Sequence, residues 1–201
     1  PGYLSHQWAK GYCQDQGATH LEVQHHHAHL LAVMAEHDIT GPVLGVTFDG
    51  TGLGDDGTLW GGELLLADVK GVERVAHLAP FKLIGGEAAI REPVRQLLGL
   101  LFESHSPEAI SALDIPLIKQ LPAERIRNLH QLWQLGRNTP YTSSIGRVFD
   151  AVAALLGVID TPDYEGEAGL LLEAAALQLA PDEQPFPLAF DLSQSTEGPL
   201  Q

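Results

Sequence analysis

The first forty residues show apolar patterns typical of two helices separated by a short extended segment. A helix is predicted over residues 5–16, and a short apolar strand is predicted over residues 21–23. Apolar residues then recur at three- and four-residue spacing. This spacing predicts a second helix that opens at a histidine cluster and runs from His25 to about His37.

Next, the pattern becomes β-rich. Extended runs are predicted over residues 42–48 and 58–68, and the Gly/Asp-rich residues 49–57 separate them. Two extended segments around such a connection favour a β-hairpin. A third strand is predicted over residues 73–78, which makes an antiparallel meander of three strands.

The rest of the chain is mostly helical in pattern. Pro93 and Pro122 should kink or shorten two of the helices, because proline lacks the amide hydrogen that a helix interior needs. Ser143 or Ser144 can cap the fourth helix, and Gly157 can end it. Apolar residues at helical spacing predict helices over residues 88–103, 107–113, 116–135, 144–157 and 166–179.

These patterns divide the chain into parts of different character. Residues 1–85 form a β-meander lobe with the histidine helix, and residues 86–180 form a helical region. The proline-containing tail, residues 181–201, is typical of a linker or of a strand without its partner. Strands first and helices afterwards indicate an α/β or α+β protein, and pattern alone leaves the topology open.

Charge and cysteine content narrow the function classes. The formal net charge of −15 repels phosphate backbones and anionic membrane surfaces, so general nucleic-acid binding is not expected, although one bound nucleotide is compatible. The single cysteine, Cys13, can form no intrachain disulfide. We find no signal-peptide pattern and no apolar run of the ~20 residues that a membrane span needs. A cytoplasmic location is expected.

The histidine cluster is the first candidate site. His25 and His29 lie four residues apart, which places both imidazoles on one face of a helix, where they could hold one metal ion together with other donors. Histidine suits zinc, iron, nickel or copper. The alternative is a polar helix start at the surface, since the catalytic Glu of H-E-x-x-H metalloproteases is absent. His26 and His27 are expected on other faces and are not assigned as ligands.

Asp49 marks a second candidate site. It is expected at the end of an apolar strand, before Gly50, Thr51 and Gly52, where backbone amides could approach an anion and the carboxylate could face a metal. The alternative is an ordinary acidic hairpin turn. The segment matches neither a P-loop nor an EF-hand.

Two later helix starts could meet a nucleotide. Gly146 lies in the first turn of a predicted helix, where phosphate could bind, and Asp150 one turn on could bind ribose hydroxyls. Gly166 and Glu167 open another helix, and the Glu167 charge complements the helix dipole. Taken alone, each segment favours a structural helix start over a ligand site.

Taken together and in order, these segments resemble the HypF hydrogenase-maturation carbamoyltransferases over nearly the whole chain. Four motifs in register carry the resemblance: residues 23–29 (VQHHHAH), residues 48–52 (FDGTG) with 59–63 (LWGGE), residues 143–157, and residues 164–167 (YEGE).

The resemblance implies part of a C-terminal, TsaD-like transferase domain. The expected fold is α/β, of the actin, sugar-kinase and chaperone-ATPase (ribonuclease H-like) type, incomplete and with an inserted helical region. It implies a divalent metal, zinc or iron, held by His25, His29 and Asp49. It also implies that ATP or carbamoyl adenylate is faced by Gly50, Thr51, Gly52, Gly146, Asp150, Gly166 and Glu167.

The implied chemistry is carbamoyl transfer. In the family, upstream domains make carbamoyl adenylate from carbamoyl phosphate and ATP, and this domain passes the carbamoyl group to the C-terminal cysteine of a HypE partner, toward the cyanide ligands of nickel-iron hydrogenase.

This chain departs mildly from the family at two positions: Glu87 stands where the family commonly has Asp, and Gly169 stands where it commonly has Ala. The family's upstream domains and a final segment with another metal-ligand aspartate are expected outside residues 1–201, so full turnover is not expected. Alternatives are a non-catalytic metal-binding docking module or another nucleotide-dependent transferase.

Overall fold

The three-stranded antiparallel meander forms as predicted, in a computed structural model that describes residues 4–179. Its strands are β1 (Val43–Leu53), β2 (Leu59–Ala67) and β3 (Val72–His77). Val43 pairs with Ala67, so β1 and β2 are aligned along nearly their whole lengths. The first strand is long because it continues past a bulge.

This continuation corrects the sequence prediction for Asp49. The pairing shifts between Phe48 and Gly52, and then resumes with Gly52 opposite Trp60. Asp49, Gly50 and Thr51 therefore form the bulged part of β1, and Gly52 is a paired residue of the same strand; none of them lies in the hairpin connection. The actual turn begins at Gly54, whose amide donates to the carbonyl of Thr58 at 2.9 Å. A bulge bends a strand and re-aims its side chains, which periodicity does not reveal.

Both N-terminal helices are confirmed as α1 (Leu4–Gln16) and α2 (His25–Glu36). The predicted strand over residues 21–23 is wrong: these residues form an extended connection without strand pairing. Leu21 is 82% exposed, so its apolar character reflects no burial against residues 4–179. A short apolar run becomes a strand only where a partner completes its backbone hydrogen bonds.

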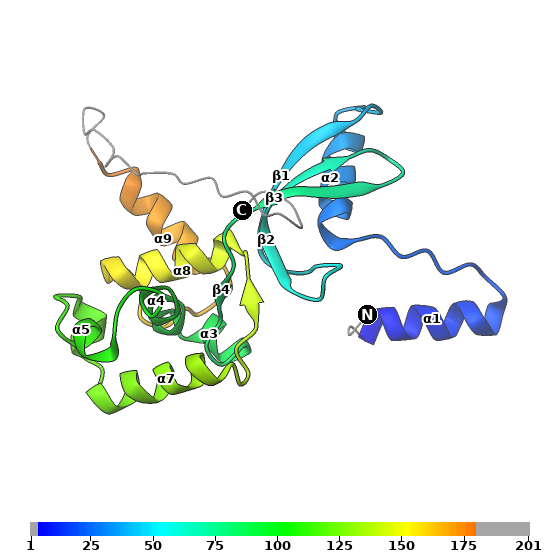
Figure 1. The fold of residues 1–201 in the computed structure, drawn as a ribbon. Coiled ribbons are helices and arrows are strands. Elements are labelled where there is room, and N and C mark those ends of the chain that lie inside the picture. The colour runs from blue at the N-terminus through cyan, green and yellow to red at the C-terminus, as the bar shows by residue number, and fades with distance from the viewer. Residues whose placement is uncertain (1–3, 180–201) are drawn as a thin grey trace.

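Helix α2 packs on the meander because its apolar stripe is matched by glycine on the strand. Leu30 and Met34 are buried on this face. A Cβ atom at Gly45 would lie 2.2 Å from Leu30 Cδ2, so only glycine allows the helix this close. Figure 1 shows α2 against the meander.

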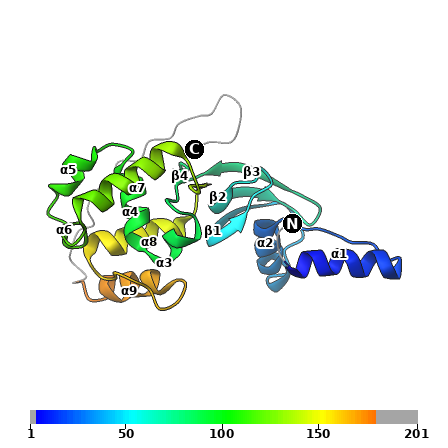
Figure 2. The ribbon, with the colours of Figure 1, turned by 90° about the horizontal axis from the view of Figure 1, so that it is seen from below.

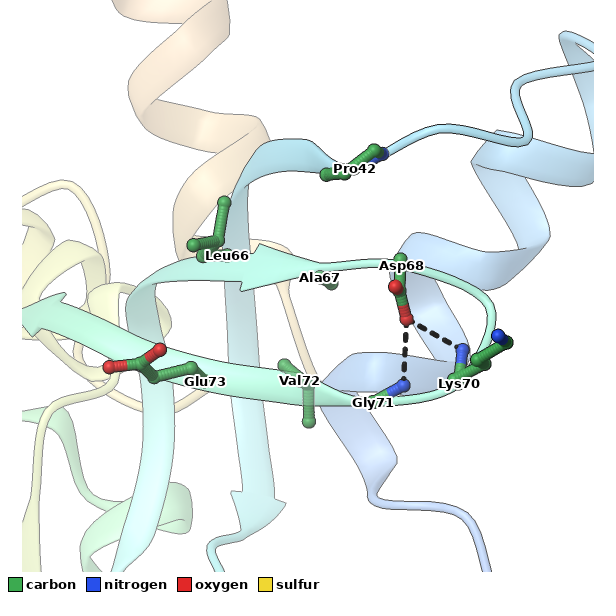
Figure 3. A pocket seen from close by; sticks show the side chains of 8 residues that line it. All are labelled: Pro42, Leu66, Ala67, Asp68, Lys70, Gly71, Val72 and Glu73. Atoms are coloured by element: carbon green, nitrogen blue, oxygen red, sulfur yellow. Dashed lines mark hydrogen bonds between the residues drawn. The ribbon is translucent and has the colours of Figure 1, made fainter.

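The turn between β2 and β3 is closed by a carboxylate. Asp68 accepts hydrogen bonds from the amides of Lys70 (2.7 Å) and Gly71 (3.0 Å) (Figure 3). Its carbonyl oxygen lies 2.7 Å from Nε2 of His27, which ties α2 to this turn. His27 is thus a structural residue, in line with its exclusion as a ligand. The Asp68 amide also donates to the Gly71 carbonyl at 3.0 Å, which completes the turn.

Two short strands that the sequence analysis missed join the sheet to the helical region. They are β4 (Phe81–Lys82) and β5 (Tyr141–Thr142). Strand β5 runs parallel to β2, and the sheet order is β1-β2-β5-β4. Strand β1 pairs along the whole of one edge of β2, and β3 and β5 share the opposite edge, with β3 at residues 63–67 and β5 at Leu59. Two residues carry no readable period, so such strands are defined only by their partners.

The helical region follows the proline pattern. Pro93 begins a new helix instead of bending a long one, and Pro122 precedes another, so both predicted interruptions are confirmed. The helices are α3 (Glu87–Arg91), α4 (Pro93–Leu101), α5 (Pro107–Ser111), α6 (Pro116–Lys119), α7 (Ala123–Leu135), α8 (Ile145–Leu156) and α9 (Glu167–Ala176).

Helix α8 is central to this region. Ser144 caps it by accepting from the Arg147 amide at 3.2 Å, and Gly157 ends it with a left-handed φ of 70°. Its buried alanines pack with apolar residues of α4 and α7 in the main core: Ile84, Val94, Leu97, Leu98, Phe102, Ile110, Leu117, Ile118, Ile126, Leu129, Ala151 and Ala154.

The helical region lies on one side of the meander and α1 on the other (Figures 1 and 2). Among residues 4–179, no helix combines the length and apolar character needed to cross a membrane. The predicted linker or unpaired strand over residues 181–201 falls outside the described residues.

Candidate metal and nucleotide site

Three predicted ligands converge where α2 begins. His25 and His29 lie one turn apart on α2, and the bulge of β1 turns Asp49 toward them. His25 Nε2 lies 2.9 Å from Asp49 Oδ2 and 3.2 Å from His29 Nε2. His29 Nε2 lies 3.7 Å from the same carboxylate oxygen. The structure thus places the three side chains around one point.

These contacts cannot all be hydrogen bonds at once. If His25 Nε2 carries a proton for Asp49, it has no lone pair to accept from His29. A metal ion removes the conflict, since all three atoms would direct lone pairs at it. With bonds of about 2.0–2.2 Å, tetrahedral donors lie about 3.4 Å apart, close to the observed spacings. Two imidazoles and one carboxylate fit zinc or iron and leave positions open for a substrate.

The local electrostatics favour an ionised Asp49. Burial acts to raise the pKa of Asp49, but hydrogen bonds with His25 and with the Gly50 amide outweigh it, so the pKa lies below its usual value. The Gly50 amide binds Oδ1 at 2.6 Å. The other oxygen, Oδ2, remains directed at the two histidines.

His26 lies closer to this cluster than the sequence analysis expected. Its ring is fully buried, and Nε2 is 3.8 Å from Asp49 Oδ2 without a hydrogen-bond partner among the described residues. Burial, followed by the nearby His25, lowers the pKa of His26. The His26 ring is therefore neutral. It lies next to the cluster and against Trp60, with the two ring centroids 5.6 Å apart.

Gly52 explains why the two histidines can reach the strand. A Cβ atom there would lie 2.4 Å from Cε1 of His26 and 2.6 Å from Cδ2 of His25. The glycine that the sequence analysis assigned to a nucleotide loop instead provides room for the histidine rings.

A pocket of ≈ 340 Å³ adjoins the other side of Asp49. Of the predicted nucleotide-facing residues, four line it: Gly50, Gly146, Asp150 and Gly166. The other three do not: Thr51, Gly52 and Glu167. The pocket lining as a whole is Phe48, Asp49, Gly50, Ile145, Gly146, Arg147, Phe149, Asp150, Glu165, Gly166 and Gly169.

Two of these three residues, Thr51 and Glu167, have local hydrogen-bond partners. The Thr51 hydroxyl donates to the Gly50 carbonyl at 2.5 Å. The Glu167 carboxylate accepts from the Asp163 amide at 2.6 Å, an N-terminal interaction of α9.

The wall between the metal cluster and the pocket is a contact of β1 with the start of α8. A Cβ atom at Gly146 would lie 2.8 Å from Gly50 Cα and 3.3 Å from the Asp49 carbonyl oxygen. The Ser144 hydroxyl lies 2.8 Å from both the Asp49 and the Gly50 carbonyl oxygens. Ser144 therefore caps α8 and holds β1 at the same time.

Arg147 is a pocket residue that sequence reasoning missed. It is 2% exposed, its Nη1 lies 3.1 Å from Asp150 Oδ2, and its Nη2 lies 3.5 Å from Glu165 Oε1. The Asp150 contact is close but poorly directed, and Nε and Nη1 make no hydrogen bond within the described part of the chain. Burial raises the pKa of Asp150, opposed by Arg147. The i,i+3 spacing to Asp150 was the available signal.

Glu63 is a second residue that the sequence analysis did not single out, and its hydrogen bonds stabilise the strands and the segment next to this wall. Its fully buried carboxylate accepts from the amides of Gly61 (2.9 Å) and Gly62 (3.1 Å), from Arg74 Nε (2.6 Å), and from the Ser143 hydroxyl. It thereby links β2, β3 and the residue before the α8 cap.

Comparison with known proteins gives the class of this chain. Residues 45–198 match the family described as carbamoyltransferase, Kae1-like domain, second subdomain, and residues 1–36 match the HypF Kae1-like domain. The class is thus a Kae1-like carbamoyltransferase domain.

The chain belongs to the HypF carbamoyltransferase family. It is 41% identical over 206 residues to carbamoyltransferase HypF of Synechocystis sp., covering 95% of this chain and 26% of that protein. It is 35% identical to a probable carbamoyltransferase HypF of Methanocaldococcus jannaschii, covering 88% and 23%. The chain thus spans about a quarter of the length of these relatives.

Solved structures confirm the ribonuclease H-like fold expected from the resemblance. A full-length HypF crystallised in a phosphate- and nucleotide-bound form matches with a TM-score of 0.83 at 37% identity, covering 99% of this chain and 29% of that one. The T. kodakarensis HypF structure matches with a TM-score of 0.80 at 35% identity, covering 98% and 26%.

Proposed function

We propose that this chain transfers a carbamoyl group from carbamoyl adenylate to the C-terminal cysteine of a HypE-type partner, in the synthesis of cyanide ligands for nickel-iron hydrogenase. The observation that carries the proposal is the position of Asp49. Its side chain belongs to the three-donor cluster, and the residue itself lines the neighbouring pocket. Metal and nucleotide would therefore meet at one residue.

The pocket suits an anionic nucleotide despite the acidic chain. Arg147 is a buried cation in its wall, with two nitrogens that lack hydrogen-bond partners among residues 4–179. Arginine is well suited to phosphate because its donors are arranged in a planar fork. The related full-length HypF, described as phosphate- and nucleotide-bound, supports ATP or its carbamoyl adenylate as the ligand.

The donor set supports a divalent metal, zinc or iron, held by His25, His29 and Asp49. When bound, such a metal supplies a Lewis acid next to the pocket. The chain's own residues prepare the site: Asp49 is ionised, and the buried His26 packs against the other histidines of the cluster. We place the reaction in the cytoplasm, in line with a chain that has a single cysteine.

Carbamoyl transfer can be tested in a longer protein that carries the upstream domains of the family. We expect His29→Ala to reduce transfer of labelled carbamoyl from carbamoyl phosphate to a HypE-type protein by about 100-fold or more, because losing a metal ligand costs more than the 10–100-fold typical of outer-shell changes. The matched control is His37→Ala at the exposed end of α2. Transfer unaffected by His29→Ala would refute a role for this cluster.

Nucleotide binding separates the enzyme from a metal-binding docking module. We expect Gly146→Ala to weaken ATP binding by about tenfold or more, because the new methyl group would push α8 off β1. Calorimetric titration of the 201-residue chain measures this. Gly71→Ala is the control, because a Cβ there meets nothing within 4 Å among the described residues. Metal binding without any ATP affinity in the unaltered chain would favour the docking module.

A further inference from the structure

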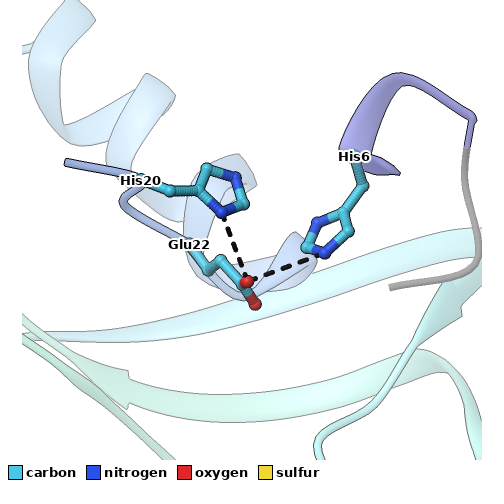
Figure 4. Close-up of side chains that lie close together, drawn as sticks. All are labelled: His6, His20 and Glu22. Carbon is cyan, nitrogen blue, oxygen red and sulfur yellow. Dashed lines mark ion pairs between the residues drawn. The ribbon is translucent and has the colours of Figure 1, made fainter. Parts of the chain in front are cut away.

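A second group of potential metal ligands lies outside the site described above. His6 of α1 meets His20 and Glu22 of the connection that leads to α2 (Figure 4). Their three donor atoms lie within 4.8 Å of one another. None of these residues belongs to a motif that the proposed carbamoyl transfer uses.

The chain path brings the three residues together. Helix α1 ends at Gln16. The next residue, Gly17, has a left-handed φ of 63° that turns the backbone, and the Ala18 amide donates to the Cys13 carbonyl at 2.9 Å. The extended connection then turns back toward the start of α1, as Figure 1 shows. This return places His20 beside His6, with their rings edge to face at a centroid distance of 5.2 Å.

The distances are those of metal ligands more than of hydrogen bonds. Glu22 Oε1 lies 3.6 Å from His6 Nε2 and 3.5 Å from His20 Nδ1. Good N–H···O hydrogen bonds have separations of about 2.7–3.2 Å. Donors on one tetrahedral ion with bonds of about 2.0–2.2 Å lie about 3.4 Å apart. The carboxylate oxygen thus stands between two ring nitrogens at the spacing that a shared ion needs.

We propose that His6, His20 and Glu22 form a second site for a divalent transition-metal ion, with zinc as the natural occupant. Two imidazoles and a carboxylate are borderline donors that suit zinc. The two histidine side chains are 21% and 23% exposed, and Glu22 is 58% exposed, so the ion could enter from solvent and keep a water ligand. The acidic chain raises the local concentration of cations.

The bound metal ion would hold α1 to the segment that leads to α2. No side chain of α1 is buried within the described residues, and Trp8 and Tyr12 stack on each other while both remain exposed. An ion shared by His6 and Glu22 would bind α1 to the segment three residues before His25. Binding free energy of this kind becomes folding free energy for the part it connects.

Zinc stoichiometry of the 201-residue chain tests the proposal. After saturation and removal of free metal, plasma mass spectrometry should find two zinc ions per unaltered chain. His6→Ala, His20→Asn and Glu22→Gln should each leave one, and His25→Ala should also leave one. Combining Glu22→Gln with His25→Ala should leave none. His105→Ala, at an exposed histidine of the helical region, should leave two.

The variants also distinguish this proposal from the proposed function. If zinc content is the same with and without His6, His20 and Glu22, the second site is refuted, whatever His25→Ala does. If those three variants lose one ion and His25→Ala loses none, the second site stands and the first fails.

Hydrogen exchange supplies an independent readout. Zinc should slow amide exchange over residues 4–22 in the unaltered chain and not in Glu22→Gln. Equal exchange with and without zinc in the unaltered chain would also refute the site.

Discussion

Replacing Glu63 with alanine is expected to lower the free energy of unfolding by about 3–5 kcal/mol, the typical cost of removing one partner of a buried ion pair. Its carboxylate is fully buried and Arg74 Nε lies 2.6 Å away. Without Glu63, Arg74 Nε and the amides of Gly61 and Gly62 lose their acceptor. The Nη1 contact with Asp56 at 3.1 Å then remains for the Arg74 charge. Urea denaturation measures the change, provided that unfolding is two-state.

A neighbouring glutamate supplies the control. Glu73 lies on β3 next to Arg74 but is exposed, so Glu73→Ala should change stability by no more than about 0.5 kcal/mol. If Glu63→Ala costs no more than this control, the buried network is not what holds β2, β3 and the start of α8 together.

The same carboxylate predicts a pH dependence. Burial acts to raise the pKa of Glu63, but hydrogen bonds from Ser143, Gly61 and Arg74 outweigh it, so the pKa in the fold lies below 4.5. Stability from Glu63 is thus fully present above pH 4.5 and is lost as the pH falls through the folded-state value. The stability difference between the unaltered chain and Glu63→Gln should shrink over this acidic range.

The second large effect concerns metal affinity at the α2 cluster. We expect His25→Ala to weaken zinc binding there by more than about 100-fold, because two protein donors remain of three and outer-shell changes alone cost 10–100-fold. His25 is also the central residue, in contact with both Asp49 and His29. Competition with a chromophoric chelator measures the affinity.

The measurement is best made in a His6→Ala background, so that an ion bound at His6, His20 and Glu22 does not contribute to the measured affinity. His37→Ala is the control, since His37 lies at the end of α2 and is exposed. Equal affinities for His25→Ala and His37→Ala would show that zinc does not bind at His25, His29 and Asp49.

The sequence by itself determined features that depend on nearby residues. The i,i+4 spacing set His25 and His29 on one face of α2, as the structure confirms. Pro93 marked an interruption of a predicted helix and Gly157 marked a helix end, because both act through their own backbone geometry. The three-strand meander followed from alternating extended and turn segments.

Only the tertiary structure decided the contacts between distant segments. The bulge in β1 aims Asp49 at α2, and the burial of His26 depends on Gly52 across the same interface. Arg147 meets Glu165 only because α8 and the start of α9 pack together. Periodicity reports which residues share a face of one element, whereas a site depends on how several elements are placed, and that placement is set by packing across the whole chain.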